Sequence, residues 1–510
     1  MAVLSLGFFL RLYALHHTYI INPDGILYIQ QARAISDGKW NAAVSCGPSF
    51  VSIYPVLIAG AHVVTRDWLT AAQSVSFIFG FGLLIPVYLI FRRFFKRPIS
   101  ILGLLAFAMM PVLIDKSADA LRDPVAWFFL CVGLYLVVSG IQLEKKAVFP
   151  VAAMVFFLVA WARIEMVTVF ALTAIYLVLY RAPKKWLQLG LFLVPMILIA
   201  LGLLTVGQIS GFPVSKATRV DEISNRLTAP AVEYGRLQKK IDELEANSKD
   251  PHVRYFLQKS KHHIWLVALG ALLTNTYEAF YFPYFLIGLV GLIGLRDRMR
   301  ASPAIAYMVW VAIGSFFMLY VNILATWMIH NRFMGIVLFP SLVVIGFGIE
   351  RVISIVQMRW IPNQTIAVGT VGVLIFGSGL YYAFEAREKD KYVYQEIAQE
   401  IHNRNRDGRY VRIAGAHSPV LEWVGFYSNA DNPEWHCARV VKLVQPPGHG
   451  PAEALLKTSA EYLLYEENLW RQKGWDLGGA MEDPGIIPIG KWRHRDTAVI
   501  RLFRIHPMSD

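Results

Sequence analysis

Long apolar stretches alternate with short polar segments along the first three quarters of the chain. A bilayer core of about 30 Å requires roughly 20 apolar residues in a helix, so these stretches predict membrane-spanning helices. The sequence therefore predicts an α-helical polytopic membrane protein with about eleven spans. We place them at residues 2–20, 69–90, 99–114, 124–142, 148–162, 164–180, 187–206, 277–295, 303–322, 333–350 and 364–384.

Two segments within this part do not fit a membrane span. Residues 21–68 form a long first loop with polar side chains at helical spacing, which predicts helices lying along the membrane interface. Residues 207–276 begin polar and end in an apolar run that is too short to cross the bilayer. We expect this second segment to be a mobile outer loop over the functional site.

Arginine and lysine residues collect in every second loop between the predicted spans. Cytoplasmic loops of membrane proteins carry such an excess of positive charge, so we expect these loops to be cytoplasmic. The N-terminus is then cytoplasmic, and the acidic turns and the C-terminal part lie outside, as in a multi-pass protein of a plasma membrane or bacterial inner membrane. The basic residues are Arg92, Arg93, Lys96, Arg97, Lys145, Lys146, Arg181, Lys184, Lys185, Arg296, Arg298, Arg300, Arg351 and Arg359.

Hydropathy falls after residue 384, and the remaining segment is long enough for a small globular domain. Strand-like and helical patterns both occur in it, which predicts a mixed α/β domain. The strand-like runs are at residues 410–414, 462–465 and 498–505, and the helical pattern is at 392–402. We expect a membrane domain over residues 1–384 and an extracytoplasmic α/β domain over residues 385–510.

The composition agrees with this class. Hydrophobic residues make up 56% of the 510 positions, charged residues make up 17%, and the formal net charge is +13. The basic excess indicates membrane topology and contact with anionic lipid, so we expect no nucleic-acid partner. The cysteines Cys46, Cys131 and Cys437 lack metal-site or redox spacing, although Cys46 and Cys437 both fall outside, where a disulfide is permitted.

The first candidate site is the segment Asn22-Pro23-Asp24-Gly25, which directly follows the first span. The Asp24 carboxylate could deprotonate an acceptor hydroxyl or help to hold a cation. An ionisable side chain is costly to keep at the face of a membrane bundle, which favours a function for it. The structural alternative is a turn that also caps a helix.

The second candidate site lies before the span at residues 124–142. Asp115, Asp119 and Asp123 are spaced by four, which would line one helical face, but Pro124 predicts a break in the helix. Asp123 before Pro124 is also a favoured helix cap. Capping and chemistry are compatible, so Asp119 and Asp123 are catalytic candidates.

Arginines at two further span mouths form the third candidate site. Arg163 and Glu165 share a tight turn, and Arg332 lies where the span at residues 333–350 begins. A guanidinium stays charged and binds oxyanions bidentately, so these arginines suit a phosphate group at the membrane surface. The alternatives are an ion pair between Arg163 and Glu165 and an interfacial anchor at Arg332.

Together these motifs resemble the membrane glycosyltransferases of the C-type superfamily, in the family 39 branch that contains protein mannosyltransferases and the lipid A aminoarabinose transferase. The resemblance covers most of residues 6–384 and depends on the order and sidedness of short motifs. The motifs are Arg11-Leu12-Tyr13, Asp24 with Tyr28 and Ala32, Tyr54-Pro55, Arg122-Asp123-Pro124, Arg163-Ile164-Glu165, and Arg332-Phe333 with Pro340.

The resemblance implies transfer of a sugar from a polyprenyl phosphate carrier, undecaprenyl or dolichyl, to a lipid, glycan or protein acceptor outside the cytoplasm. The anomeric carbon would be inverted. Asp24 then matches the catalytic acid of the first loop, Asp123 that of the second, and Arg332 a phosphate contact. Asp119 is a further catalytic candidate, and the predicted substrate-binding residues beside Arg332 are Tyr28, Tyr54, Arg122, Arg163 and Glu165.

Two positions depart from the pattern of this family. Gly25 stands where many members carry a second acid after the first-loop aspartate, so a divalent cation is not supported and we expect no cofactor. The aminoarabinose transferases also offer a lysine to the lipid phosphate from this loop, and the segment around Gly47-Pro48-Ser49 has none.

Two other functions share part of this pattern. A transporter or flippase of lipid-linked sugars would place its charges near the midplane and show repeated halves, whereas here the charges gather at one face. A polymerase or ligase of surface glycans would use the same outer site with a large acceptor groove. The sequence has no Gly-rich phosphate loop, which argues against a soluble nucleotide donor.

Overall fold

The computed structural model describes residues 1–45, 50–179, 185–210, 220–385, 387–405, 409–430, 432, 440–443, 459–475 and 485–505. Contacts divide the chain into two compact units. The membrane unit consists of Met1–Leu15, Ser52–Tyr54 and Gln73–Glu385, and the C-terminal unit of His16–Val51, Pro55–Ala72 and Ala386–Asp510. The pair Cys46 and Cys437 lies outside the described residues.

The membrane unit is helical throughout its described length, as the apolar pattern predicts. Its elements are α1 (Ala2–His16), α5 (Trp68–Gly82), α6 (Leu84–Phe94), α7 (Arg97–Met109), α8 (Pro111–Ala118), α9 (Asp123–Leu143), α10 (Val148–Ala162), η1 (Ile164–Met166), α11 (Val167–Leu179), α12 (Lys185–Ser210), α14 (Val220–Asn247), α15 (Pro251–Phe280), α16 (Phe282–Gly291), α17 (Leu295–Ala301), α18 (Pro303–Thr326), η2 (Asn331–Met334), α19 (Gly335–Leu338), α20 (Leu342–Arg359) and α21 (Gln364–Ala383).

Among the described residues, 5 helices are long and apolar enough to cross a membrane, or up to 7 if two bent pairs each form one span. The bent pairs are α7 with α8, at 53°, and the segment Asn331–Leu338 with α20, at 77°. Pro111 and Pro340 stand at these bends, where a proline lacks the N–H that would continue the helix. The remaining predicted spans coincide with the shorter apolar helices α1, α10, α11 and α16.

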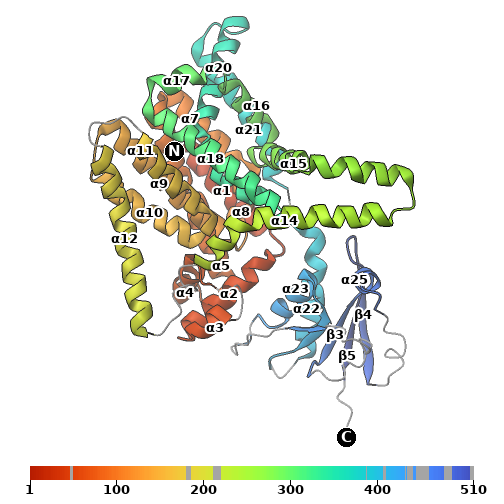
Figure 1. Ribbon diagram of the computed structural model, residues 1–510. Coiled ribbons are helices and arrows are strands. Elements are labelled where there is room, and N and C mark those ends of the chain that lie inside the picture. Colours follow the sequence, from red (N-terminus) through yellow and green to blue (C-terminus); the bar gives the residue numbers. More distant parts are fainter. Residues whose placement is uncertain are drawn as a thin grey trace. The chain divides into compact units, whose positions relative to one another are not determined.

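Within the segment predicted as an outer loop, the described residues 220–276 are helical. The helices α14 and α15 pack side by side as a long hairpin (Figure 1). Asp250 caps α15 by accepting a hydrogen bond from the His252 N–H at 2.8 Å, and Lys261 joins the two helices through Asp242 at 2.5 Å. The apolar run near residue 270 is the second half of α15 rather than an isolated segment.

Small residues allow close helix packing in the membrane unit. A Cβ atom on Gly291 of α16 would fall 2.8 Å from the backbone nitrogen of Gly348 in α20. Helices in a membrane gain little from the hydrophobic effect against each other, so this close backbone approach supplies the van der Waals contact that holds them.

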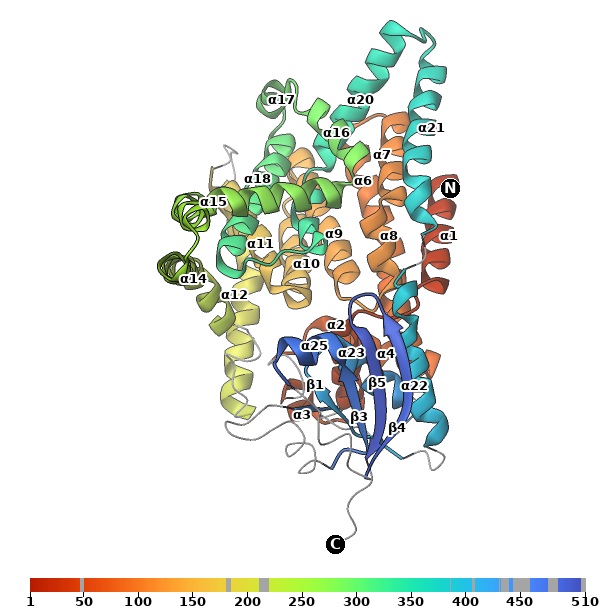
Figure 2. The same cartoon turned by 90° about the vertical axis from the view of Figure 1, so that its right-hand side faces the viewer.

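The C-terminal unit contains a mixed five-stranded sheet in the order β2-β1-β3-β5-β4 (Figure 2). β1 pairs in parallel with β2 and β3, while β5 pairs antiparallel with β3 and β4. The strands are β1 (Ile413–Ala416), β2 (Val440–Leu443), β3 (Tyr462–Glu466), β4 (Ile486–His494) and β5 (Ala498–Ile505), and the helices are α22 (Val393–Arg404), α23 (Pro419–Ser428) and α25 (Glu467–Gln472).

The first loop contributes helices to the same unit. These are α2 (Pro23–Ser36), α3 (Trp40–Ser45) and α4 (Ile53–Thr65). Most of α4 belongs to the C-terminal unit. Its predicted helical character is therefore confirmed. Gln31 on α2 is buried and donates hydrogen bonds to the carbonyls of Ala43 at 3.0 Å and Phe50 at 2.8 Å, so this polar side chain closes the loop on itself.

Candidate functional site

A buried ion-pair cluster joins two of the predicted motifs in the membrane unit. The Arg163 guanidinium pairs with the Asp123 carboxylate through Nη1 and with Glu165 at 2.7 Å from Nε and 2.5 Å from Nη2. The Asp123 and Arg163 side chains are 1% and 3% exposed. The alternative of an Arg163–Glu165 ion pair is thus confirmed, and Asp123 is an additional partner.

Asp123 does not cap α9, so the capping interpretation is wrong. The cap position is Arg122, and no side chain makes a capping hydrogen bond there. Asp123 is the first residue of α9 and is followed by Pro124, so its carboxylate points to Arg163 instead. Asp119 has extended backbone after α8 ends at Ala118, which confirms the predicted break and removes the three acids from a common helical face.

Phe333 brings the third motif to the same cluster. The Arg163 guanidinium carbon lies 4.4 Å from the centre of the Phe333 ring, and that of Arg332 lies 5.7 Å from it. Both distances suit cation–π contacts. Arg163 is engaged by two carboxylates and a ring, whereas the half-buried Arg332 lies at the edge of this cluster.

Two buried polar atoms in the first two turns of α9 have no hydrogen-bond partner among the described residues. These are Oδ2 of Asp123 and Nε1 of Trp127, which lie one helical turn apart. A Cβ atom on Gly335 would collide with Trp127 Nε1, so glycine at this position allows the backbone to pack directly against the indole. Buried polar groups are rarely left unsatisfied, so the Asp123 Oδ2 atom is a candidate for contact with a bound ligand.

Tyr54 stabilises the turn that leads into this cluster. Its hydroxyl is buried and lies 2.8 Å from Ser76 Oγ, which donates to the Leu121 carbonyl at 2.8 Å and accepts from the Leu121 N–H at 3.2 Å. Asp119 caps the same turn by accepting from the Ala120 N–H at 2.8 Å. The predicted site residues Tyr54 and Asp119 thus both make contacts within this turn.

Asp24 and its neighbour Tyr28 belong to the C-terminal unit. Asn22 is the cap of α2, and its side chain accepts a hydrogen bond from the Asp24 N–H at 3.0 Å. The turn-and-cap interpretation of this segment is confirmed, but the capping side chain is Asn22. The half-buried Asp24 carboxylate lies in the first turn of α2, one helical turn before the buried Tyr28.

The chain that leads into α2 is tied to the C-terminal domain by backbone hydrogen bonds. Ile21 accepts a hydrogen bond from Trp423 Nε1 at 2.7 Å and donates to the Tyr427 hydroxyl at 3.1 Å. Tyr19 donates to the Arg387 carbonyl at 3.2 Å and accepts from Gln395 Nε2 at 2.5 Å. The C-terminal domain therefore positions the loop that carries Asp24.

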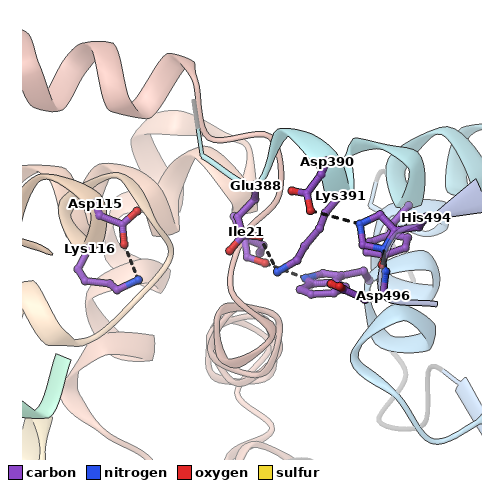
Figure 3. Close-up of polar contacts among 10 residues, drawn as sticks. Ile21, Asp115, Lys116, Glu388, Asp390, Lys391, His494 and Asp496 are labelled. Atoms are coloured by element: carbon purple, nitrogen blue, oxygen red, sulfur yellow. Dashed lines mark hydrogen bonds and ion pairs between the residues drawn. The ribbon is translucent and has the colours of Figure 1, made fainter. Parts of the chain in front are cut away.

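Within the C-terminal unit, the buried His494 lies close to Asp390 and Asp496 (Figure 3). His494 Nδ1 accepts a hydrogen bond from the Asp496 N–H at 3.2 Å and lies 3.0 Å from the Tyr394 hydroxyl. A backbone N–H can only donate, so Nδ1 carries the lone pair and the neutral ring has its proton on Nε2, 3.4 Å from Asp390. The three possible ligand atoms lie within 4.8 Å of one another, but the backbone hydrogen bond to Nδ1 occupies one of the two ring nitrogens that could bind a metal.

Glu466 is a buried carboxyl at the end of β3. It accepts a hydrogen bond from the Ser418 hydroxyl, which also caps α23 by accepting from the Leu421 N–H at 3.1 Å. Burial raises the pKa of the Glu466 carboxyl to about 7, and the hydrogen bond from Ser418 opposes this rise. The charge of this group therefore changes near neutral pH.

No protein-family model and no curated protein matches the chain. Solved structures do match it. ArnT from Cupriavidus metallidurans bound to undecaprenyl phosphate is similar over 98% of this chain and 97% of that chain, with a TM-score of 0.60 and 11% sequence identity. The Archaeoglobus fulgidus oligosaccharyltransferase in complex with Zn and sulfate is similar over 98% of this chain and 72% of that chain, with a TM-score of 0.54 and 12% identity.

The fold of the chain is similar to the folds of ArnT and of the archaeal oligosaccharyltransferase. The resemblance seen in the sequence is confirmed at the level of the fold, as is the prediction of a polytopic membrane protein with a small C-terminal domain. The apo state of the same ArnT gives the same TM-score of 0.60 at 10% identity.

Two residues of the membrane unit acquire significance only from the structure. Ser76 and Trp127 lie in apolar helices where nothing in the sequence marks them. Arg11 was visible as a charge within the first span, and it is fully buried, donating to the carbonyls of Gly80 at 3.1 Å and Ala108 at 3.4 Å. Charged residues within spans are the available signal for such contacts between helices.

Proposed function

We propose that the protein is an inverting glycosyltransferase that moves a sugar from a polyprenyl phosphate carrier to a hydroxyl of an acceptor on the outer face of the membrane. The observation that carries the proposal is the fold likeness to ArnT bound to undecaprenyl phosphate, which extends over 98% of this chain. The acceptor is a lipid, glycan or protein. The basic loops support a plasma-membrane or bacterial inner-membrane protein whose C-terminal domain is extracytoplasmic.

The reaction breaks the bond between the anomeric carbon and the phosphate oxygen. The acceptor oxygen forms a new bond to that carbon from the opposite side, the bonding pair leaves with the phosphate, and the acceptor proton passes to a base. Positive charge develops on the sugar and negative charge on the leaving phosphate, so carboxylates suit the first and guanidinium groups the second.

Asp24 takes the acceptor proton in this scheme. The Asn22 side chain caps α2, so capping of this helix does not depend on the Asp24 carboxylate. Backbone hydrogen bonds to Trp423 and Tyr427 hold the chain just before it, which supports a defined position for the carboxylate.

Asp123 and Arg332 bind the donor in this scheme. The Oδ2 atom of Asp123 is available to a sugar hydroxyl because Arg163 engages the other oxygen. Arg163 is a positioning residue, since a phosphate would have to displace one of its two carboxylates. Arg332 is the guanidinium we assign to the carrier phosphate.

The test uses the purified full-length protein with radiolabelled polyprenyl phosphate sugars and a membrane extract as the acceptor source. Consumption of a labelled donor with release of polyprenyl phosphate supports the proposal. A flippase assay with the same labelled donor in sealed vesicles distinguishes a transferase from a transporter. A transporter would move the intact lipid across the bilayer without cleaving it.

A further inference from the structure

An apolar cavity of about 280 Å³ opens between α15, α16, α18 and the segment that joins α19 to α20. Its lining is hydrocarbon apart from two hydroxyls. Thr276 donates to the Leu272 carbonyl at 2.7 Å and Ser341 to the Val337 carbonyl at 2.8 Å, so each hydroxyl is satisfied within its own segment. The cavity thus offers no polar group to a ligand, and a hydrocarbon chain fits it better than water.

A second cavity of about 420 Å³ adjoins the first and shares Leu295, Val309 and Ile313 with it. Arg296 and Arg300 line this second cavity. They are four residues apart on α17 and therefore lie on one helical face. The two cavities form a groove lined by hydrocarbon along α16 and α18, and the aliphatic stems of the two exposed arginines of α17 border it.

These two arginines differ from the arginine between them. Arg298 pairs with Glu350 at 2.8 Å and stacks on the Phe347 ring at 3.9 Å. Arg296 and Arg300 are exposed and have no ion pair or side-chain hydrogen bond within the part of the chain that the structure describes. Asp297 is the one acid of α17, and helical geometry turns it about 100° away from Arg296.

We propose that this groove binds an anionic phospholipid, with the phosphate at Arg296 and Arg300 and an acyl chain in the apolar cavity. Two guanidinium groups at the end of a hydrocarbon-lined groove match a lipid phosphate at the end of an acyl chain in both charge and polarity. Neither Asp24 nor Asp123 lines this groove, and the lipid site stands independently of the transferase proposal.

The other hydrocarbon source is the polyprenyl chain of a donor, which would enter near Thr276. The Thr276 hydroxyl lies 3.5 Å from the sulfur of Met334, which directly follows Phe333 of the cluster described above. A donor chain in this cavity would be anchored by its phosphate elsewhere. Its binding would therefore not depend on Arg296 and Arg300.

The experiment measures lipid binding to the purified full-length protein by native mass spectrometry, with phosphatidylglycerol and phosphatidylcholine as probes. The double variant Arg296→Gln/Arg300→Gln should weaken phosphatidylglycerol binding about thirtyfold. Each basic residue near an anionic lipid surface contributes about 1 kcal/mol to binding, and two such losses correspond to about this factor in affinity. The matched control Lys145→Gln/Lys146→Gln loses the same charge and should bind as the wild type does. Ala312→Phe, which fills the cavity without a charge change, should also weaken binding.

Equal phosphatidylglycerol affinity in the wild type and the arginine double variant would overturn the proposal. So would equal loss in the lysine control, because that result would reflect net charge alone. Displacement of bound lipid by undecaprenyl phosphate to the same extent in the wild type and the arginine double variant would assign the groove to the polyprenyl chain and also overturn it.

Discussion

Arg163 and Asp123 form a buried ion pair although they are 40 residues apart in the sequence. Removing one partner of such a pair leaves an uncompensated buried charge, which typically costs about 3–5 kcal/mol. Asp123→Ala should therefore lower the unfolding temperature of the detergent-purified protein strongly. The double variant Asp123→Ala/Arg163→Met should lose less stability than the sum of the two single variants.

Additive losses in that cycle would show that the two side chains do not interact. The matched control is Lys116→Met with Asp115→Ala, a pair that is adjacent in sequence and more exposed. We expect a much smaller coupling there, because exposed ion pairs contribute about 0–1 kcal/mol.

Asp24→Asn should lower kcat a hundredfold or more while expression and membrane insertion stay normal. Asparagine cannot accept the proton, and general-base catalysis typically contributes that much. Asp37→Asn at the C-terminal end of the same helix is the matched control, since the Asp37 side chain is 46% exposed and pairs with the exposed Lys39. Substantial transfer by a well-folded Asp24→Asn protein would remove Asp24 from the catalytic role.

Arg332→Lys should raise the KM for the polyprenyl phosphate donor. Lysine keeps the positive charge but loses the planar fork that binds a phosphate through two parallel hydrogen bonds. The variant is compared with Arg359→Lys, a basic residue at the end of α20. Unchanged KM and kcat in Arg332→Lys would remove Arg332 from the donor site.

Glu466 should make the stability of the C-terminal domain depend on pH. Burial raises its folded-state pKa from the ordinary 4.5 to about 7, so the folded protein holds this proton between those values while the unfolded chain releases it. The free energy of unfolding then falls as pH rises through this window, by up to about 3 kcal/mol. Glu466→Gln should be more stable than the wild type at pH 8 and close to it at pH 4.5.

Thermal unfolding of the full-length protein at these two pH values measures the effect. Glu467→Gln is the matched control. The Glu467 carboxylate is next in sequence to Glu466, but it is 30% exposed and pairs with Arg471. A pH dependence that is the same in the wild type and in Glu466→Gln would contradict the assignment.

The sequence predicted strands where a run of strand-forming residues is not interrupted by proline or glycine. The runs at residues 462–465 and 498–505 match β3 and β5. β4 was not predicted because Pro488 and Gly490 interrupt its pattern. In the structure β4 is an edge strand with a register shift at these residues, and an edge strand tolerates the missing N–H of proline.

The sequence predicted the members of the site better than their contacts. Arg163 and Glu165 are near neighbours, so their ion pair could be anticipated from spacing. The partnership of Arg163 with Asp123 depends on how α9 and α10 pack, which hydropathy does not encode. Asn22 and Asp24 are both good caps by residue type, and only the backbone of α2 shows that Asn22 has that role.

The most direct test of the account measures the release of polyprenyl phosphate from a labelled polyprenyl phosphate sugar by the purified wild type and by Asp24→Asn, with the same acceptor extract. The account predicts release by the wild type, with the sugar recovered on the acceptor in inverted configuration, and a rate at least a hundredfold lower in the variant. Intact donor after incubation with the wild type across the whole panel of polyprenyl phosphate sugars would contradict the account.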